Sequence, residues 1–188
     1  EYAYSLFMQF KYDEAIPLYE KLIAQGFDNF ESNFILGLCY EDQPDNEKAL
    51  KHYQKAVQFK NDNATCLFHL ALIEKSFCMD LLSMAHFNQS LEVSLPKGRA
   101  LRTYKWLADL HFQHHRYADA ARDFELCTLY DEEDSPLNYY NAAQMFIASK
   151  NKLKAKLYLQ MFLANANRLE DKKEAAQLIS KAKEQLKQ

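Results

Sequence analysis

The residues that could bind a metal ion are gathered in the stretch HFQHHRYADA, residues 111–120. His111 and His115 stand four positions apart, the spacing at which two imidazoles on one helix face can share a metal. His114 and Asp119 are near them in the sequence. A structural metal site normally needs four ligands, however, and no cysteine lies at a matching distance. We therefore expect His111 to pack inside, and His114 and His115 to lie at a turn between helices.

A second cluster that could do chemistry is DEED, residues 131–134. Its carboxylates could attract a divalent ion or a basic partner, but an exposed acidic loop at a helix end is the ordinary explanation and the one expected here. The sequence has no G-x-S-x-G turn, no Gly-rich phosphate loop and no carboxylate pair typical of a glycosidase. We therefore predict that the protein is not an enzyme and that it needs no cofactor and no metal.

The composition also argues against nucleic-acid binding and against a membrane-spanning segment. The net charge is only -3 and no long run has one sign, which argues against a nucleic-acid surface. The longest apolar runs are far too short to span a bilayer. With three glycines and four prolines among 188 residues, the chain favours helices joined by short polar loops.

The cysteines indicate a reducing compartment, because Cys39, Cys66, Cys78 and Cys127 are widely spaced and form no CxxC pair. We expect each to be a small buried side chain. A cytoplasmic location follows as an expectation, with a periplasmic or secreted one left open. The chain begins with Glu1 rather than a methionine, which suggests a fragment or a processed product.

Small residues recur along the chain with a period of 34 positions. Gly37 has one such residue 34 positions before it and another 34 positions after it. Twelve positions beyond each lies a second small residue, and an aromatic residue follows four positions later. Three extra residues near 94–100 separate the third copy of this spacing from a fourth. A fifth, weaker copy follows. The two sets of small residues are Ala3, Gly37, Ala71, Ala108 and Ala143, and Ala15, Ala49, Ser83, Ala120 and Ala155.

Each period divides into two helix-length segments around a polar turn. In DQPDNEKA, residues 42–49, Asp45 is a plausible N-cap for the second segment. We therefore predict pairs of antiparallel helices. A glycine inside a helix costs about 1 kcal/mol relative to alanine. We expect Gly37 to be kept because a small residue at the crossing lets two helix backbones approach closely.

This pattern resembles the tetratricopeptide repeat (TPR), whose 34-residue signature contains L-G-x2-Y, then A-x3-F, then a late alanine. Leu36-Gly37-x2-Tyr40 with Ala49-x3-Tyr53 matches it well, and Leu107-Ala108 with Ala120-x3-Phe124 matches again. The resemblance implies an all-α, right-handed α-solenoid of about five helix-turn-helix units followed by a C-terminal capping helix. The expected units are 1–29, 30–63, 64–99, 100–134 and 135–165, with the cap at 166–188. A coiled-coil arm is the alternative for this last helix.

In TPR proteins the first helix of each repeat lines a concave groove, and the resemblance transfers this role to matching positions here. It implies an apolar end, a charged band and then a mixed end. The alternative is that the aromatic residues are used up in packing between units. Of the residues that a clamp for acidic C-terminal tails would need, only Arg102 is compatible. The implied groove positions are Tyr4, Phe7, Phe34, Leu38, Phe68, Leu72, Arg102, Lys105, Asp109, Phe112, Tyr140 and Gln144.

The sequence therefore predicts a non-catalytic scaffold or adaptor that holds an extended peptide or an amphipathic helix of another protein. Two alternatives stay open. The chain could be a structural solenoid that self-associates through an open end into a homo-oligomer. It could also be a chaperone-like or accessory region of a larger protein. Nucleic acid and a membrane span are not expected among its partners.

Overall fold

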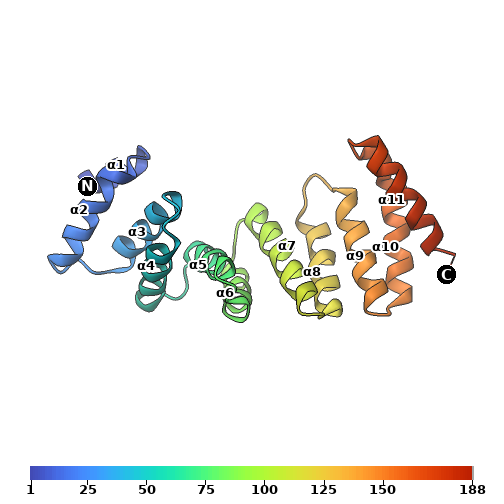
Figure 1. Ribbon diagram of the computed structural model, residues 1–188, viewed down its shortest axis with the longest axis horizontal. Coiled ribbons are helices and arrows are strands. Elements are labelled where there is room, and N and C mark those ends of the chain that lie inside the picture. The colour runs from blue at the N-terminus through green and yellow to red at the C-terminus, as the bar shows by residue number, and fades with distance from the viewer. Residues whose placement is uncertain (188) are drawn as a thin grey trace. The chain divides into compact units, whose positions relative to one another are not determined.

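The computed structural model describes residues 1–187, which form eleven α-helices, one short 3-10 helix and no strand (Figure 1). The chain divides into two compact units, Glu1–Leu95 and Pro96–Gln188. The predicted all-α class is confirmed. The helices are α1 (Tyr2–Met8), α2 (Tyr12–Ala24), α3 (Phe30–Asp42), α4 (Asn46–Phe59), α5 (Ala64–Ser76), α6 (Asp80–Val93), α7 (Lys97–Gln113), α8 (Tyr117–Tyr130), α9 (Pro136–Ala148), α10 (Lys152–Asn165), η1 (Ala166–Arg168) and α11 (Lys172–Gln185).

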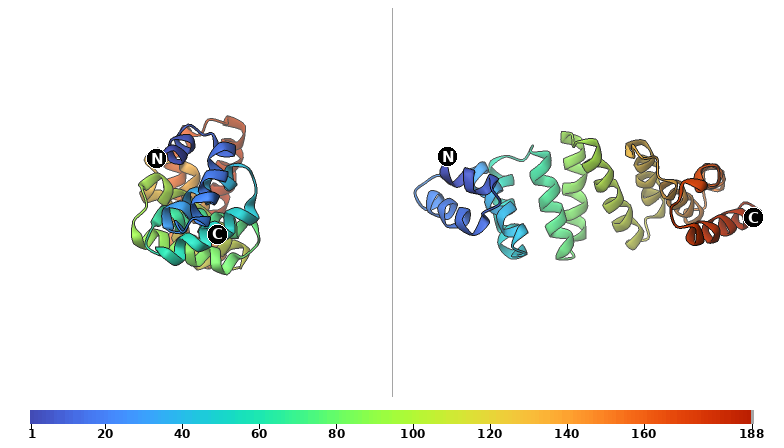
Figure 2. Two further views of the ribbon diagram at one scale, coloured as in Figure 1. Left: turned by 90° about the vertical axis from the view of Figure 1, so that its left-hand side faces the viewer. Right: turned by 90° about the horizontal axis from the view of Figure 1, so that it is seen from above.

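The helices pack as pairs, each made of a first and a second helix joined by a short turn (Figure 2). In the first unit the pairs are α1 with α2, α3 with α4 and α5 with α6. In the second unit they are α7 with α8 and α9 with α10. Helix α11 packs back onto the last pair through Ala182, which is fully buried. It therefore caps the array, as predicted, and does not extend as an arm.

The predicted small residues lie at the crossings inside these pairs, and all of them are buried. At the crossing of α3 and α4, a Cβ added to Gly37 would lie 2.5 Å from Cε1 of the buried Tyr53 ring. Only a residue without a side chain lets that ring fill the space. Where Ser83 replaces the usual alanine, its hydroxyl donates a hydrogen bond across the crossing to the Ala71 carbonyl at 2.8 Å.

A second contact inside the pairs joins the residues that lie three positions after the small residue of each helix. In four of the five pairs these two residues are complementary. Tyr40 stacks on His52 with ring centroids 5.6 Å apart, and Phe146 packs on Tyr158 at 5.4 Å. Each of the other two pairs joins a histidine to a carboxylate, and the two residue types are exchanged between the helices. Glu74 on α5 contacts His86 Nδ1 at 2.7 Å, whereas on α7 the acid and base are exchanged, with His111 Nδ1 2.7 Å from Asp123.

The turns inside the pairs share one backbone conformation that no glycine signals. In four of them the residue seven positions after the small residue has a φ between 57° and 62°: Phe10, Cys78, His115 and Lys150. The next residue donates a backbone hydrogen bond to the helix, as Arg116 does to the His111 carbonyl at 2.8 Å. This closes the helix C-terminus. The side chain at the left-handed position is exposed in all four.

Two expectations about single residues are decided by this geometry. The predicted N-cap is confirmed, because the Asp45 carboxylate accepts a hydrogen bond from the Lys48 backbone N–H at 3.2 Å. The prediction that every cysteine is buried is wrong for Cys78, which occupies the left-handed turn position and is exposed. The 34-residue period alone gives no sign that this position faces solvent.

The crossing at Gly37 generates the first prediction. Gly37→Ala should lower the free energy of unfolding by about 1–3 kcal/mol, because the new methyl group overlaps the Tyr53 ring. Urea-induced unfolding followed by circular dichroism measures the change. The matched control is Gly98→Ala, since an added Cβ there has no atom within 4 Å. That control should be neutral or stabilise by up to about 1 kcal/mol, and equal effects of the two variants would contradict the steric explanation.

The contact of Glu74 on α5 with His86 on α6 generates a second prediction. The Glu74 side chain is 1% exposed, so His86→Ala should leave a buried carboxylate without its partner. The expected loss of unfolding free energy is about 3–5 kcal/mol. The double variant Glu74→His with His86→Asp copies the polarity of His111 and Asp123 and should recover most of that loss. A loss below about 1 kcal/mol for the single variant would show that the pair is unimportant for stability.

Candidate protein-binding surface

The implied groove positions of the first unit lie on α1, α3 and α5, and they differ in how much of each side chain reaches solvent. Phe34 is half-buried: its ring stacks on Phe30 at 5.5 Å and lies 6.2 Å from Tyr53. Phe68 is only 2% exposed and packs on Phe87 at 6.0 Å. The ring of Phe68 is therefore used in packing, which is the alternative that the sequence left open.

The remaining apolar positions of this unit keep part of their surface exposed. Leu38 on α3 and Leu72 on α5 are half-buried. Near the N-terminus, Phe7 is half-buried between Tyr4 and Tyr12, with ring centroids 6.1 and 5.9 Å away, and Tyr4 is 52% exposed. The first-helix side of this unit thus presents partly exposed leucine and aromatic side chains.

Glu41 follows Phe34 and Leu38 along the same side of α3 and links three helices. It accepts a hydrogen bond from the Tyr53 hydroxyl at 2.5 Å and lies 2.9 Å from His69 Nδ1. Burial on its own raises the pKa of the Glu41 carboxyl. The hydrogen bond and charge of His69, together with the Tyr53 hydroxyl, outweigh burial and hold the pKa below 4.5. An ionised carboxylate therefore stabilises the packing of α3, α4 and α5.

In the second unit, the implied positions on α7 are more polar. Arg102 and Lys105 are exposed, and Asp109 is half-buried and accepts a hydrogen bond from Gln113 at 3.0 Å. Phe112 is 47% exposed, and its ring lies 6.0 Å from that of Tyr117. This helix therefore presents charged side chains with one aromatic ring at its end.

The side chains at the two implied positions on α9 are largely engaged in contacts within the protein. Tyr140 is 7% exposed and packs on Phe162 at 5.0 Å. Its hydroxyl is the one buried side-chain polar atom without a hydrogen-bond partner among residues 1–187. Gln144 exchanges two amide hydrogen bonds with Gln185 on α11, at 2.9 and 3.0 Å. The capping helix therefore engages the position where the sequence predicted a mixed end of the groove.

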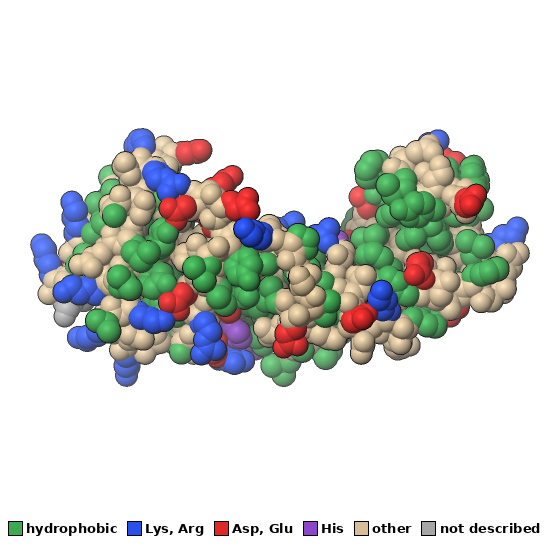
Figure 3. Space-filling model, turned by 180° about the vertical axis from the view of Figure 1, so that it is seen from behind, with side chains coloured by type: hydrophobic (Ala, Val, Ile, Leu, Met, Phe, Trp, Pro, Cys, Tyr) green, Lys and Arg blue, Asp and Glu red, His purple; other side chains and the backbone are tan. Residues whose placement is uncertain are grey.

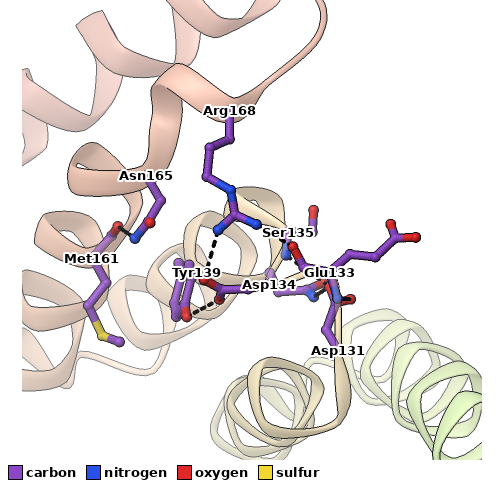
Figure 4. A network of polar contacts seen from close by, with 9 residues as sticks. Asp131, Glu133, Asp134, Ser135, Tyr139, Met161, Asn165 and Arg168 are labelled. Carbon is purple, nitrogen blue, oxygen red and sulfur yellow. Dashed lines mark hydrogen bonds and ion pairs between the residues drawn. The ribbon is translucent and has the colours of Figure 1, made fainter.

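The acidic loop at 131–134 follows the end of α8 with Glu132 and Glu133 exposed, and two of its carboxylates bind neighbouring residues (Figure 4). Arg168 donates to the Asp134 carboxylate at 2.8 Å and to the Glu133 carbonyl, and the Tyr139 hydroxyl also donates to Asp134. The Asp131 carboxylate accepts hydrogen bonds from backbone N–H groups just before α9. Two of its four carboxylates thus fasten the loop to α9 and η1.

The histidines considered as metal ligands point to separate places. His111 is buried against Asp123, as expected for an internal position, whereas His115 lies beyond the end of α7 and contacts the Tyr117 hydroxyl at 2.9 Å. They do not share a helix face. Within residues 1–187, no three His, Cys, Asp or Glu side chains form a group able to hold a metal ion. Over the same range, no helix is both long and apolar enough to cross a bilayer.

The Glu41 network predicts a specific response to acid. Because the folded-state pKa of Glu41 is lowered, its contribution to stability is present above the unfolded-state pKa and is lost as the pH falls through the folded-state value. Glu41→Gln should therefore lose less unfolding free energy than the parent chain between about pH 5 and about pH 3. Urea unfolding at the two pH values measures this. Glu31→Gln, an exposed change on the same helix, should leave the loss unchanged.

Comparison with known proteins agrees with the repeat signature. Residues 8–79 match the family model described as "Anaphase-promoting complex, cyclosome, subunit 3", which is less than half of the chain. Comparison with curated proteins finds no match.

Solved structures share the fold over most of the chain. YrrB, described as a TPR protein with an unusual peptide-binding site, has a TM-score of 0.73 at 16% identity, covering 95% of this chain and 88% of its own. MamA has a TM-score of 0.70 at 14% identity, covering 89% and 96%. The APC/C hetero-tetramer Cut9–Hcn1 gives 0.59 at 16% identity, covering 96% and 35%. In its repeat signature and in its fold, the chain is similar to tetratricopeptide-repeat proteins.

Proposed function

We propose that the chain is a non-catalytic adaptor that holds a segment of a partner protein against its first helices. The observation that carries this proposal is the row of half-buried apolar side chains Phe34, Leu38 and Leu72 on α3 and α5. Each is fixed by packing on one side and open to solvent on the other. A partner segment that buried the open sides would gain about 25 cal/mol for each Å² of apolar surface removed from water.

The polar residues of the same helices would set how the segment is oriented. In the first unit, Glu41 is fixed by Tyr53 and His69, so it offers a rigid acceptor beside the apolar row. In the second unit, Arg102 and Lys105 are exposed and present positive charge. Fixed charged groups next to an apolar surface contribute to specificity more than to affinity.

Two similar proteins support a role in protein binding. The description of YrrB names a peptide-binding site, and Cut9 is described in a hetero-tetramer with Hcn1. Both share the fold with this chain at low identity. Because the sequences differ so much, the side chains of this protein, and not the shared fold, would determine which partner it binds.

Self-association is the second candidate, because the first helix pair exposes large apolar side chains. Figure 3 shows hydrophobic side chains gathered at this end of the first unit, and Tyr2, Met8 and Phe10 are 69%, 57% and 78% exposed. An unpaired apolar end is the usual route by which a helical repeat array adds a further copy. This candidate predicts a dimer joined through α1.

Site-specific photo-crosslinking tests the adaptor proposal. A benzophenone amino acid at position 72 or 105 should give a discrete adduct with a partner protein, whereas the same group at Lys51 or Gln54, exposed on α4, should not. With the identified partner in recombinant form, Leu72→Asp should weaken binding at least about tenfold by calorimetry, while circular dichroism stays unchanged. Adducts from α4 alone would refute the proposal, and adducts of twice the chain mass would establish self-association instead.

A further inference from the structure

A pocket of about 450 Å³ lies at the C-terminal end of the second unit. The turn between α9 and α10 forms one side and the end of α11 forms the other. Its apolar wall is made by Ile147, Ala155, Leu159 and Leu186, and its polar wall by Gln185 and three lysines, Lys150, Lys152 and Lys156. A volume of this size accommodates one or two large side chains of a bound molecule.

The three lysines differ from other basic residues nearby because no group within residues 1–187 neutralises them. Lys154 binds the Glu125 carboxylate at 2.8 Å, and Arg168 binds Asp134 at 2.8 Å. Within the described residues, Lys150, Lys152 and Lys156 form no ion pair and no side-chain hydrogen bond. Three uncompensated ammonium groups around one concavity repel one another, and an anion bound there would relieve that repulsion.

The positive charge of this pocket is part of a local excess. Residues 150–188 contain ten Lys or Arg and only four Asp or Glu, although the whole chain has a net charge of -3. Figure 3 shows basic side chains over this end of the second unit. The local excess attracts an acidic partner over a distance of roughly a Debye length, about 8–10 Å in physiological salt.

The pocket wall is held in place before any ligand arrives. The reciprocal amide pair of Gln144 and Gln185 fixes the end of α11 against α9. Leu159 is 2% exposed, and Leu186 packs against the same core cluster. A preformed wall avoids the entropy cost of ordering flexible side chains on binding.

We propose that this pocket binds an acidic segment of a partner protein that carries one large apolar side chain. The apolar side chain inserts against Ile147, Leu159 and Leu186, and flanking carboxylates pair with Lys150, Lys152 and Lys156. None of the pocket residues is among those named for the proposed function, so either site can exist without the other. Nucleic acid fits less well because it needs a long row of phosphate contacts, and a flat membrane surface cannot enter a concavity.

A labelled synthetic peptide tests the proposal directly. The peptide DESFEED should bind the chain in fluorescence anisotropy, and the affinity should fall as salt is raised. The charge-reversal variant Lys150→Glu, Lys152→Glu, Lys156→Glu should weaken binding by about tenfold or more. A second peptide, DESSEED, keeps the charge but lacks the apolar side chain and should bind the parent chain at least about tenfold more weakly.

The control variant is Lys173→Glu, Lys181→Glu, Lys183→Glu, which makes the same change in net charge on exposed positions of α11 that do not line the pocket. It should retain most of the binding, and circular dichroism should confirm that both variants fold. Equal weakening in the two variants would show a diffuse charge effect and overturn the proposal. So would equal binding of the two peptides, absence of binding, or stronger binding to anionic lipid vesicles that is lost with the pocket lysines.

Discussion

The structure depends on the close approach of two helix backbones inside each repeat. At Gly37 the approach is so close that the Tyr53 ring occupies the place of a side chain. The ring is fully buried, and its hydroxyl emerges beside Glu41, which in turn contacts His69 on the next helix pair. The absence of one Cβ therefore determines where a carboxylate on α3 stands, and that carboxylate ties the second pair of helices to the third.

Three residues after each small residue, the two helices of a pair meet again through a second contact. The location of this contact is the same from repeat to repeat, but the residue types that form it differ. Aromatic stacking joins Tyr40 to His52, and a His–carboxylate pair takes the same position in the next two repeats with its polarity exchanged. Burial raises the pKa of Asp123, and its contacts with His111 act in the opposite direction. Each pair is complementary within itself, so one repeat can change chemistry without altering its neighbours.

Residue spacing was enough to predict the helix pairs, the buried small residues, the Asp45 cap and the internal position of His111, because each follows from local periodicity. Local periodicity does not show which of two equivalent side chains is covered by a neighbouring helix. Phe34 and Phe68 occupy matching positions, yet Phe68 is buried because Phe87 packs on it. Long-range pairs were equally hidden: Arg168 holds a loop 34 residues earlier, and Gln185 reaches Gln144 across 41. Such partners are fixed by the packed structure and not by any local pattern.

The left-handed turn residue found in four of the helix pairs has a further consequence. Its backbone angles are constrained, but its side chain meets no packing requirement, so an aromatic ring, a thiol, an imidazole and an ammonium group all occur there, at Phe10, Cys78, His115 and Lys150. Selection acting on these positions can alter the outer chemistry of one repeat without disturbing its core. These exposed turn positions can therefore vary independently of one another. One of them, Lys150, contributes a positive charge to the basic pocket.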